Sequence, residues 1–534
     1  MPGGPWRLFE EKIMIRTNFL VCFAASLLLG ACGSAQEPAQ FDVLIINGTV
    51  YDGSKAPARR TNIGIVEDRI VSMDAAADAQ SDRVIDAEGL VVVPGFIDPH
   101  THADEVFEAD KSENINYLAQ GVTTVFVGND GRGIPERAEG VATMQSQGIG
   151  TNVGYFVGHG TVRQKVMGLE NRAPTDDELE QMRELVAADM RGGALGLSSG
   201  LFYTPGSFAE TDEVIELAKV AAEFGGVYDS HMRDESSYNI GVLGSIKELI
   251  EIGEEANIPV HAAHLKALGR DVWGQSGDII ALVDMARERG VEVTADQYPW
   301  RASGTSLGSS LVPSWVRADS REAMFGRLDN PDLGDQIREE MEGNLWRRGG
   351  KDSLLITGES EWRGMTLGDI AEQMGVEPVA AAIEVVRSGD PSVASFNMDP
   401  PDINALAIQD WVMTGSDGSN GHPRKFASYP KGYRDFVVDS SLMSMEQFVH
   451  RSSGLVADSF YLCDRGYLEA GRKADIAIID LDTYLPVADF ENPTRLATGI
   501  FHLIVNGIPA IAAGKPTGRL SGEVIDRQNL QCNQ

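Results

Sequence analysis

The sequence predicts an α/β protein built on an eight-stranded (β/α)8 barrel. A small β-sandwich is expected from the two ends of the chain, and an inserted lobe between the seventh and eighth barrel strands. Three observations lead to this prediction. Short apolar segments recur about every thirty residues with helical patterns between them, which is typical of repeated βα units. Both ends of the chain have strand and turn patterns, and 534 residues exceed one compact core of usual size.

The two ends of the chain supply the expected sandwich. Residues 41–93 alternate apolar runs with turns, and Asn47-Gly48 is a hairpin signal, so we expect a small antiparallel unit there. Strand and turn patterns return near the C-terminus. We therefore expect residues 41–93 and 455–530 to pack into one β-sandwich, with the barrel, residues 94–454, inserted between them.

Eight segments account for the barrel strands. The segments between them have apolar residues at three- and four-residue spacing, as in residues 176–191 and 211–225, which is the pattern of amphipathic helices. Residues 301–410 connect the last two strands, although a single helix would be long enough for this connection. The additional residues predict a lobe inserted over the barrel mouth. The predicted strands are residues 90–100, 121–128, 152–159, 194–200, 226–231, 258–264, 291–300 and 411–417.

Composition excludes some classes of partner. Lys plus Arg number 45 against 79 Asp plus Glu, and this net charge of -34 argues against nucleic acid or an anionic membrane surface. The cysteines show neither zinc-finger spacing nor a disulfide framework. They are Cys22, Cys32, Cys463 and Cys532.

Residues 1–34 have the pattern of a secretory signal. An apolar run from Phe19 to Leu29 follows a basic start, and it is too short to span a bilayer stably. The ending Leu-Gly-Ala-Cys resembles a bacterial lipoprotein signal, which implies cleavage before Cys32 and lipidation of that residue. We expect an exported, periplasmic protein whose one membrane link is a lipid anchor to the outer membrane at Cys32. The alternative is an ordinary signal peptide cut elsewhere.

Metal-ligating residue types follow the predicted barrel strands at the ends where such barrels carry their active sites. The first strand runs into His100 and His102, which leave on one face because they are two residues apart. Each histidine alone could be an ordinary core or loop residue. Together, four imidazoles and two carboxylates fit a site for one or two divalent ions, zinc first among them, with an open position for water. The candidate ligands are His100, His102, Asp130, His231, His264 and Asp417.

Ten sequence motifs indicate a protein family more specifically than the residues at the strand ends do. They are PGFIDPHTHAD (94–104), GVTTVFVGNDG (121–131), GHGTVR (158–163), GALGLSSGLFYTPG (193–206), HMRDE (231–235), AHLK (263–266), ADQYPW (295–300), GSDG (415–418), HPR (422–424) and GRKADIAIID (471–480). From about Phe41 to Arg519, the chain resembles the N-acyl-D-amino-acid deacylases (D-aminoacylases) of the amidohydrolase superfamily. The resemblance implies a metal-dependent TIM-barrel hydrolase that cleaves N-acyl-D-amino acids or small peptides with a C-terminal D-residue.

One position departs from that family. Its second-strand motif usually ends Asn-Cys-Gly with the cysteine as metal ligand, whereas this chain reads Asn-Asp-Gly, with Asp130 in the cysteine's place. A carboxylate is a harder ligand than a thiolate, and its two oxygens can bridge two ions. We expect Asp130 to replace the cysteine as ligand. The alternative is a turn residue beside the site.

The resemblance also implies individual roles. Asp417 is expected to act as general base and acid, taking a proton from metal-activated water and giving it to the leaving amine. Arg424, Lys266 and Tyr298 match family positions that bind the substrate carboxylate, and Tyr203 lies near them. The partner is then a small N-acyl amino acid or short peptide. The alternatives are a dipeptidase or cyclic-amide hydrolase of the same superfamily, or a non-catalytic periplasmic binding protein.

Overall fold

The computed structural model describes residues 40–103, 106, 108, 111–133 and 137–530. The expected signal segment, residues 1–34, lies outside the described residues. None of the described helices combines the length and the apolar character needed to cross a membrane.

All eight expected barrel segments contain strands, and neighbouring strands run parallel in two hydrogen-bonded groups, β6-β7-β8 and β9-β10-β11-β12-β13-β17. The third segment divides at Phe156 into β8 and β9, one in each group. A backbone bridge between Thr101 and Gly418 joins the first segment to the eighth. These strands are β6 (Phe96–Asp98), β7 (Val122–Val127), β8 (Asn152–Tyr155), β9 (Val157–Gly158), β10 (Gly196–Gly200), β11 (Val227–His231), β12 (Val260–Ala262), β13 (Val293–Gln297) and β17 (Val412–Thr414).

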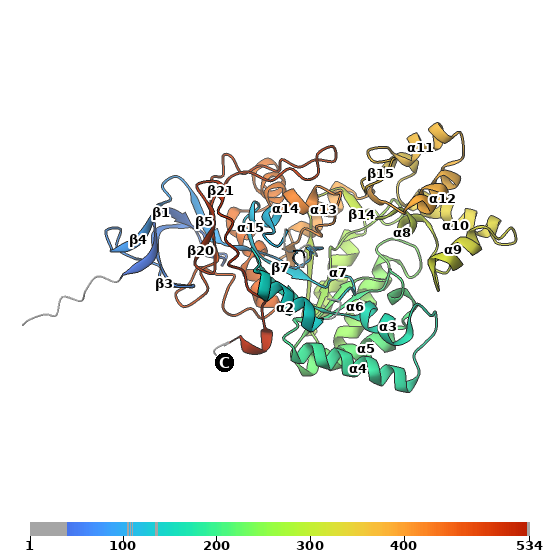
Figure 1. Ribbon diagram of the computed structural model, residues 1–534, viewed down its shortest axis with the longest axis horizontal. Helices are drawn as coiled ribbons and strands as arrows, with labels where there is room; N and C mark the ends of the chain where they lie inside the picture. The colour runs from blue at the N-terminus through green and yellow to red at the C-terminus, as the bar shows by residue number, and fades with distance from the viewer. Residues whose placement is uncertain (1–39, 104–105, 107, 109–110, 134–136, 531–534) are drawn as a thin grey trace, which may run out of the picture. The chain divides into compact units, whose positions relative to one another are not determined.

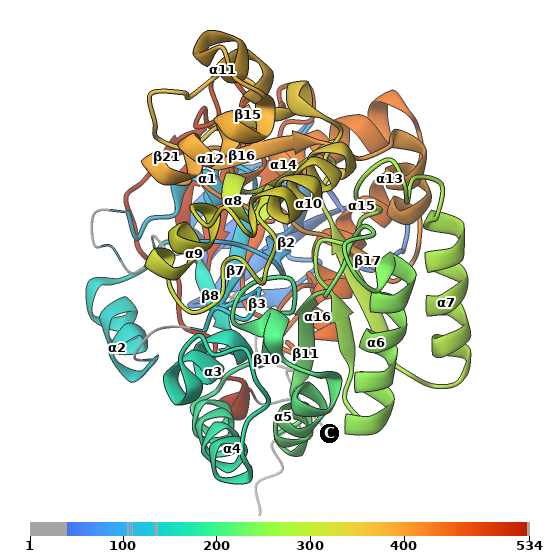
Figure 2. The same ribbon diagram turned by 90° about the vertical axis from the view of Figure 1, so that its right-hand side faces the viewer.

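Amphipathic helices surround these strands, and Figure 2 shows α4 to α7 along the outside of β10, β11 and β17. Helix α4 begins with a capping box between Thr175 and Glu178 and buries Met182, Val186 and Met190 on one face. The barrel helices are α1 (Ile115–Leu118), α2 (Arg137–Gln147), α3 (His159–Met167), α4 (Asp176–Arg191), α5 (Thr211–Glu223), α6 (Gly241–Ala256), α7 (Ser276–Glu288), α13 (Pro400–Ala407), α14 (Arg424–Gly432), α15 (Met445–Ser452) and α16 (Gly454–Ser459).

The expected lobe lies between β13 and β17. It contains an antiparallel sheet in the order β14-β16-β15 and has its own hydrophobic cluster, in which Leu311, Met341 and Val385 are fully buried. The lobe helices gather at the opposite end of Figure 1 from strands β1 to β5, which lie within residues 41–94. The elements are β14 (Ala302–Ser306), α8 (Leu307–Leu311), α9 (Arg321–Leu328), α10 (Gly334–Arg347), β15 (Leu354–Ile356), α11 (Leu367–Met374), α12 (Pro378–Ser388) and β16 (Ser392–Phe396).

The two ends of the chain form one nine-stranded mixed sheet, which corrects the expected β-sandwich and its antiparallel N-terminal unit. The order is β21-β20-β19-β18-β5-β1-β2-β3, with β4 beside β1 (Figure 1). Strand β1 pairs antiparallel with β2 but parallel with β4 and β5. The strands are β1 (Phe41–Val50), β2 (Arg59–Val66), β3 (Arg69–Ser72), β4 (Ser81–Asp86), β5 (Val91–Pro94), β18 (Ile476–Ile479), β19 (Ile500–Val505), β20 (Ile508–Ala512) and β21 (Lys515–Pro516).

The hairpin expected at Asn47-Gly48 is a bulge inside β1. The register with β2 shifts between Ile45 and Gly48, and Asn47 has a φ of 63°. A side chain at Gly48 would place its Cβ 2.5 Å from Cγ2 of Val92. The dipeptide signalled a left-handed residue and a close backbone approach, which a bulge requires as much as a turn does.

Cys463 is disulfide-bonded. The expectation that the cysteines carry no disulfide framework is therefore wrong at this position. Four cysteines distributed over a long chain have no spacing pattern from which a single bond could be predicted.

Candidate functional site

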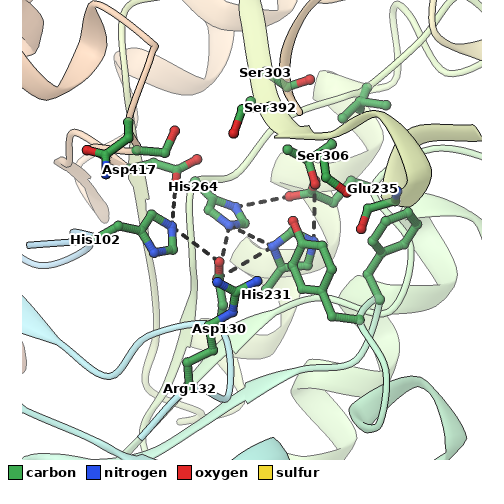
Figure 3. A pocket seen from close by; sticks show the side chains of 18 of the residues that line it. His102, Asp130, Arg132, His231, Glu235, His264, Ser303, Ser306, Ser392 and Asp417 are labelled. Atoms are coloured by element: carbon green, nitrogen blue, oxygen red, sulfur yellow. Dashed lines mark hydrogen bonds and ion pairs between the residues drawn. The ribbon is translucent and has the colours of Figure 1, made fainter. Parts of the chain in front are cut away.

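Five strand ends place the predicted metal ligands around one cavity. His100 and His102 follow β6, Asp130 follows β7, and His231 is the last residue of β11. His264 follows β12, and Asp417 follows β17. The structure brings all six together, as Figure 3 shows for the five that it labels.

Asp130 lies at the centre of the four histidines. Its Oδ1 is 3.3 Å from Nε2 of His100, 3.5 Å from Nδ1 of His231 and 3.4 Å from Nε2 of His264. Its Oδ2 is 3.5 Å from Nε2 of His102. The two oxygens therefore face different histidines, which is the arrangement that a carboxylate bridging two ions needs.

The donor set fits a divalent transition metal. Among the described residues, the buried ring nitrogens of His100 and the Oδ1 of Asp130 have no hydrogen-bond partner, and Nδ1 of His231 faces Nε2 of His264 at 2.8 Å. Imidazole and carboxylate groups with unused lone pairs at such spacing are typical of zinc sites. Three overlapping groups can each hold one ion: His100, His102 and Asp417; His100, Asp130 and His264; and His231, Glu235 and His264.

The carboxylates of this cluster are held in the ionised form. Burial favours the neutral acid, but the charges of His100 and His231 keep the pKa of Asp130 well below its usual range. For Asp417, the nearby Arg424 and His264 likewise outweigh burial and lower the pKa. The site therefore offers charged oxygen ligands at neutral pH.

Three candidate ligands have left-handed backbones. The φ angles are 57° for Asp130, 37° for His264 and 47° for Asp417. Such conformations cost about 1–3 kcal/mol each in residues other than glycine and persist only where the surroundings enforce them. Each of the three residues lies just after a barrel strand, so part of the backbone strain of the chain falls at the candidate site.

Buried carboxylates beneath the cluster hold the ligand loops in place. Oδ1 of Asp98 accepts hydrogen bonds from the backbone N–H of His100 at 3.3 Å and of Ser416 at 3.0 Å. Oδ2 of Asp296 accepts the N–H of His264 at 3.0 Å and lies 3.0 Å from Nε2 of His261. The sequence analysis took its candidates from the ends of the strands, so it did not predict a role for Asp98 or Asp296, which lie within strands. Asp98 does belong to the motif PGFIDPHTHAD.

Glu235 is a further site residue that the sequence reasoning did not single out. Its Oε1 lies 3.1 Å from Nδ1 of His264 and accepts a hydrogen bond from Nζ of Lys266 at 2.5 Å. Its Oε2 is 3.9 Å from Nε2 of His231. The motif HMRDE ends at Glu235, and from this motif Glu235 could have been predicted as a site residue.

A cavity of about 440 Å³ opens over the cluster. Its floor includes the candidate ligands His102, Asp130 and His264, while the lobe supplies another wall (Figure 3). This volume suits a small-molecule substrate.

The four predicted substrate residues divide into two pairs. Lys266 and Tyr203 line the cavity. Tyr298 and Arg424 are buried behind its wall, with the Arg424 guanidinium 4.8 Å from the centre of the Tyr298 ring. Nη1 of Arg424 pairs with Oδ2 of Asp417 at 2.7 Å, so that this guanidinium already has a carboxylate partner. Binding of a substrate carboxylate by these residues stays a prediction.

A barrel with a buried cluster of histidines and carboxylates at its strand ends has the architecture of the metal-dependent barrel hydrolases. The model of the amidohydrolase family matches residues 83–299. A D-aminoacylase from Alcaligenes xylosoxydans xylosoxydans is 31% identical over 529 residues, which cover 92% of this chain and 99% of that enzyme. The chain belongs to the D-aminoacylase family of amidohydrolases.

Solved structures agree with this assignment. An N-acyl-D-glutamate deacylase from Bordetella bronchiseptica, in complex with zinc and a phosphonate that mimics the tetrahedral intermediate, matches with a TM-score of 0.78 and 29% identity. A D-aminoacylase structure described with a binuclear metal centre has the same TM-score and identity. Each match covers 91% of this chain and all of the solved one.

Proposed function

We propose that this protein hydrolyses the amide bond of N-acyl-D-amino acids, or of small peptides with a C-terminal D-residue, with zinc in the His–Asp cluster. The observation that carries the proposal is the position of Asp130 among four histidines, with Asp417 at 3.2 Å from His102, under a substrate-sized cavity. The choice of a D-amino acid is supported by the relatives, whose names specify that configuration.

The six candidate ligands, Asp130 among them, would hold one or two ions. When bound, a divalent ion polarises the amide carbonyl and lowers the pKa of water. The lowered pKa keeps Asp417 ionised at neutral pH, which is the form that a general base needs to accept a proton from the attacking water before it passes that proton to the leaving nitrogen. Arg424 fixes one Asp417 oxygen, which leaves the other facing His102 and the cavity.

Lys266 is placed to orient an anionic substrate near the cluster. It lines the cavity, and its Nζ lies 2.9 Å from Nδ1 of His264 and contacts Glu235. The α-carboxylate of an N-acyl amino acid is separated from the scissile nitrogen by one carbon, so its partner must lie close to the reacting centre. A lysine two residues after a metal ligand satisfies this requirement as a point charge.

A paired substrate screen tests the proposal. Purified protein with quantified metal is assayed for amine release from N-acetyl-D- and N-acetyl-L-amino acids, dipeptides and cyclic amides. Turnover of D substrates in preference to L substrates is expected. A fully loaded protein that hydrolyses cyclic amides or L-dipeptides, but no D substrate, would establish one of the alternative activities. Absence of any turnover would favour the binding protein.

We propose in addition that the protein is exported and anchored to the outer membrane by a lipid on Cys32. The support is the signal pattern of residues 1–34 and the disulfide at Cys463, because disulfides persist mainly in oxidising compartments. Expression of the full chain and of a Cys32→Ala variant, followed by membrane fractionation and lipid labelling, tests this. The wild type should be labelled and membrane-bound, and equal labelling of the variant would contradict the proposal.

A further inference from the structure

One buried arginine of the lobe faces the cavity without a carboxylate partner. Arg348 comes directly after α10, lines the cavity and is 3% exposed. Its Nε donates to the Tyr238 hydroxyl at 2.6 Å, and its Nη1 donates to Oγ of Ser303 at 3.4 Å. Among the described residues, no Asp or Glu forms an ion pair with it.

Three of the other buried arginines of the described chain have a carboxylate partner. Arg163, Arg424 and Arg465 each pair with a buried carboxylate, from Glu213, Asp417 and Asp475 respectively. Arg451 donates to two backbone carbonyl oxygens. A guanidinium cannot lose its proton, and burial without a counter-charge is costly. Arg348 has two hydroxyl partners and lies 5.6 Å from the centre of the Tyr238 ring, and unlike Arg451 it lines the cavity, where an anion can supply the missing counter-charge.

The wall around Arg348 is built for a polar group. Five hydroxyl residues of the lobe line this part of the cavity, and Figure 3 shows Ser303, Ser306 and Ser392 across the cavity from Asp130. A second guanidinium stands behind this wall, since Nη1 of Arg317 donates to Oγ of Ser309 at 3.3 Å. A carboxylate can accept hydrogen bonds from a guanidinium and from hydroxyl groups, whereas an apolar substituent can accept none. The five residues are Ser303, Thr305, Ser306, Ser309 and Ser392.

We propose that Arg348 binds a second carboxylate of the substrate, carried by the amino acid side chain or by the acyl group. The inference rests on the proposed deacylase function and adds a substrate class to it. The α-carboxylate must lie near the metal ligands, where Lys266 is available. Arg348 instead lies with Ser303 on the lobe side, where a longer substituent can reach. The enzyme then prefers dicarboxylic substrates to their uncharged isosteres.

Two isosteric substrate pairs test this with metal-loaded enzyme. N-acetyl-D-glutamate is compared with N-acetyl-D-glutamine, and N-succinyl-D-alanine with N-succinamoyl-D-alanine. In one pair, kcat/KM for the acid should exceed that for the amide by roughly 10- to 100-fold, as expected for a hydrogen bond to a charged group. The pair that shows the preference identifies which end of the substrate reaches Arg348.

Variants then connect the preference to Arg348. Arg348→Gln should reduce kcat/KM for the acid far more than for the amide and bring their ratio close to one, while Arg348→Lys should retain part of it. Arg347→Gln is the matched control, because Arg347 stacks on the same Tyr238 ring but is not among the residues that line the cavity. Its ratio should remain that of the wild type. Metal content and thermal unfolding verify that each variant is folded.

The outcomes separate two failures. If the wild type hydrolyses the neutral D substrates and shows no preference for the acid in either pair, the inference is overturned and the deacylase function stands. An equal loss for acid and amide in Arg348→Gln also overturns it, because that pattern would place the α-carboxylate at Arg348. If loaded enzyme hydrolyses no D substrate, neutral ones included, the proposed function itself has failed.

Discussion

Nη1 of Arg424 lies 2.7 Å from Oδ2 of Asp417, and the two side chains are 1% and 6% exposed. The pair links the strand end that carries the predicted catalytic acid to the start of α14. Because the arginine occupies one oxygen, the carboxylate can turn only the other toward His102 at 3.2 Å. In its predicted role as general base and acid, Asp417 would therefore exchange a proton through the oxygen that faces His102.

Replacement of Asp417 by Asn keeps the shape of the side chain and removes its charge. We expect kcat to fall by about 10²- to 10⁴-fold, the usual contribution of a positioned general acid or base. Steady-state kinetics, together with metal analysis, distinguish lost proton transfer from lost metal. Asp410→Asn, at an exposed position just before β17, should retain wild-type kinetics. Full activity of Asp417→Asn would remove Asp417 from the catalytic role.

Asp130 is predicted to be a metal ligand in place of the family cysteine, so Asp130→Ala should lower the metal content of the purified protein. Four histidine nitrogens lie within 3.5 Å of its oxygens, so the variant loses the carboxylate that lies nearest to all four candidate histidine ligands. Elemental analysis should find less metal per chain than in the wild type. Asp130→Cys restores a ligand and should recover metal. Unchanged metal in Asp130→Ala would show that Asp130 is not a ligand.

Asp98 is expected to act through the ligands that it positions. It accepts the N–H groups of His100 and Ser416, and burial raises its pKa to about 7. Asp98→Asn should weaken metal binding by about 10- to 100-fold, as is usual for groups that orient metal ligands. Competition with a chelator measures this affinity. Asp82→Asn, at an exposed position, is the control. If the wild type and both variants bind the metal with equal affinity, Asp98 has a purely structural role.

The barrel was predictable because its signal is repeated. Each strand is a short apolar run that precedes an amphipathic helix, and strand ends converge by the geometry of the fold. His231 and His264, 33 residues apart, could thus be assigned to one site before their 2.8 Å contact was known. No comparable rule predicts how the strands of the terminal sheet pair. Whether β4 and β5 pair parallel with β1 depends on contacts that no local pattern records.

Residues that act through tertiary contacts escaped sequence reasoning. Arg348 follows an ordinary amphipathic helix, and nothing in its neighbourhood distinguishes it from Arg347. One lines the cavity, whereas the other lies 3.9 Å from Asp271. Likewise, Arg424 could be assigned to substrate binding from its motif, but its ion pair with Asp417 appears only in the folded chain. The sequence supplies the residue types, and packing decides their partners.

Glu213 offers a test of how a buried network stabilises the barrel in acid. It lies 2.9 Å from Nε2 of His159 and pairs with Arg163, and all three side chains are buried. Burial raises the pKa of Glu213, but the hydrogen bonds and charges of His159 and Arg163 outweigh it, and the net pKa is lowered. Because the folded pKa lies below the unfolded one, the stabilisation is complete above the unfolded value of about 4.3 and is lost as pH falls through the folded pKa.

Glu213→Gln should therefore lower the free energy of unfolding at neutral pH by about 3 kcal/mol, since it leaves the Arg163 guanidinium buried without a counter-charge. Below about pH 4 the difference from the wild type should shrink, because the wild-type carboxyl is then protonated in the unfolded chain and increasingly in the folded one. Urea unfolding across this range measures both. Glu223→Gln, exposed at the end of the same helix, should follow the wild type at every pH. A constant gap between wild type and Glu213→Gln down to the acid limit would mean that the loss arises from packing rather than from the charge of Glu213.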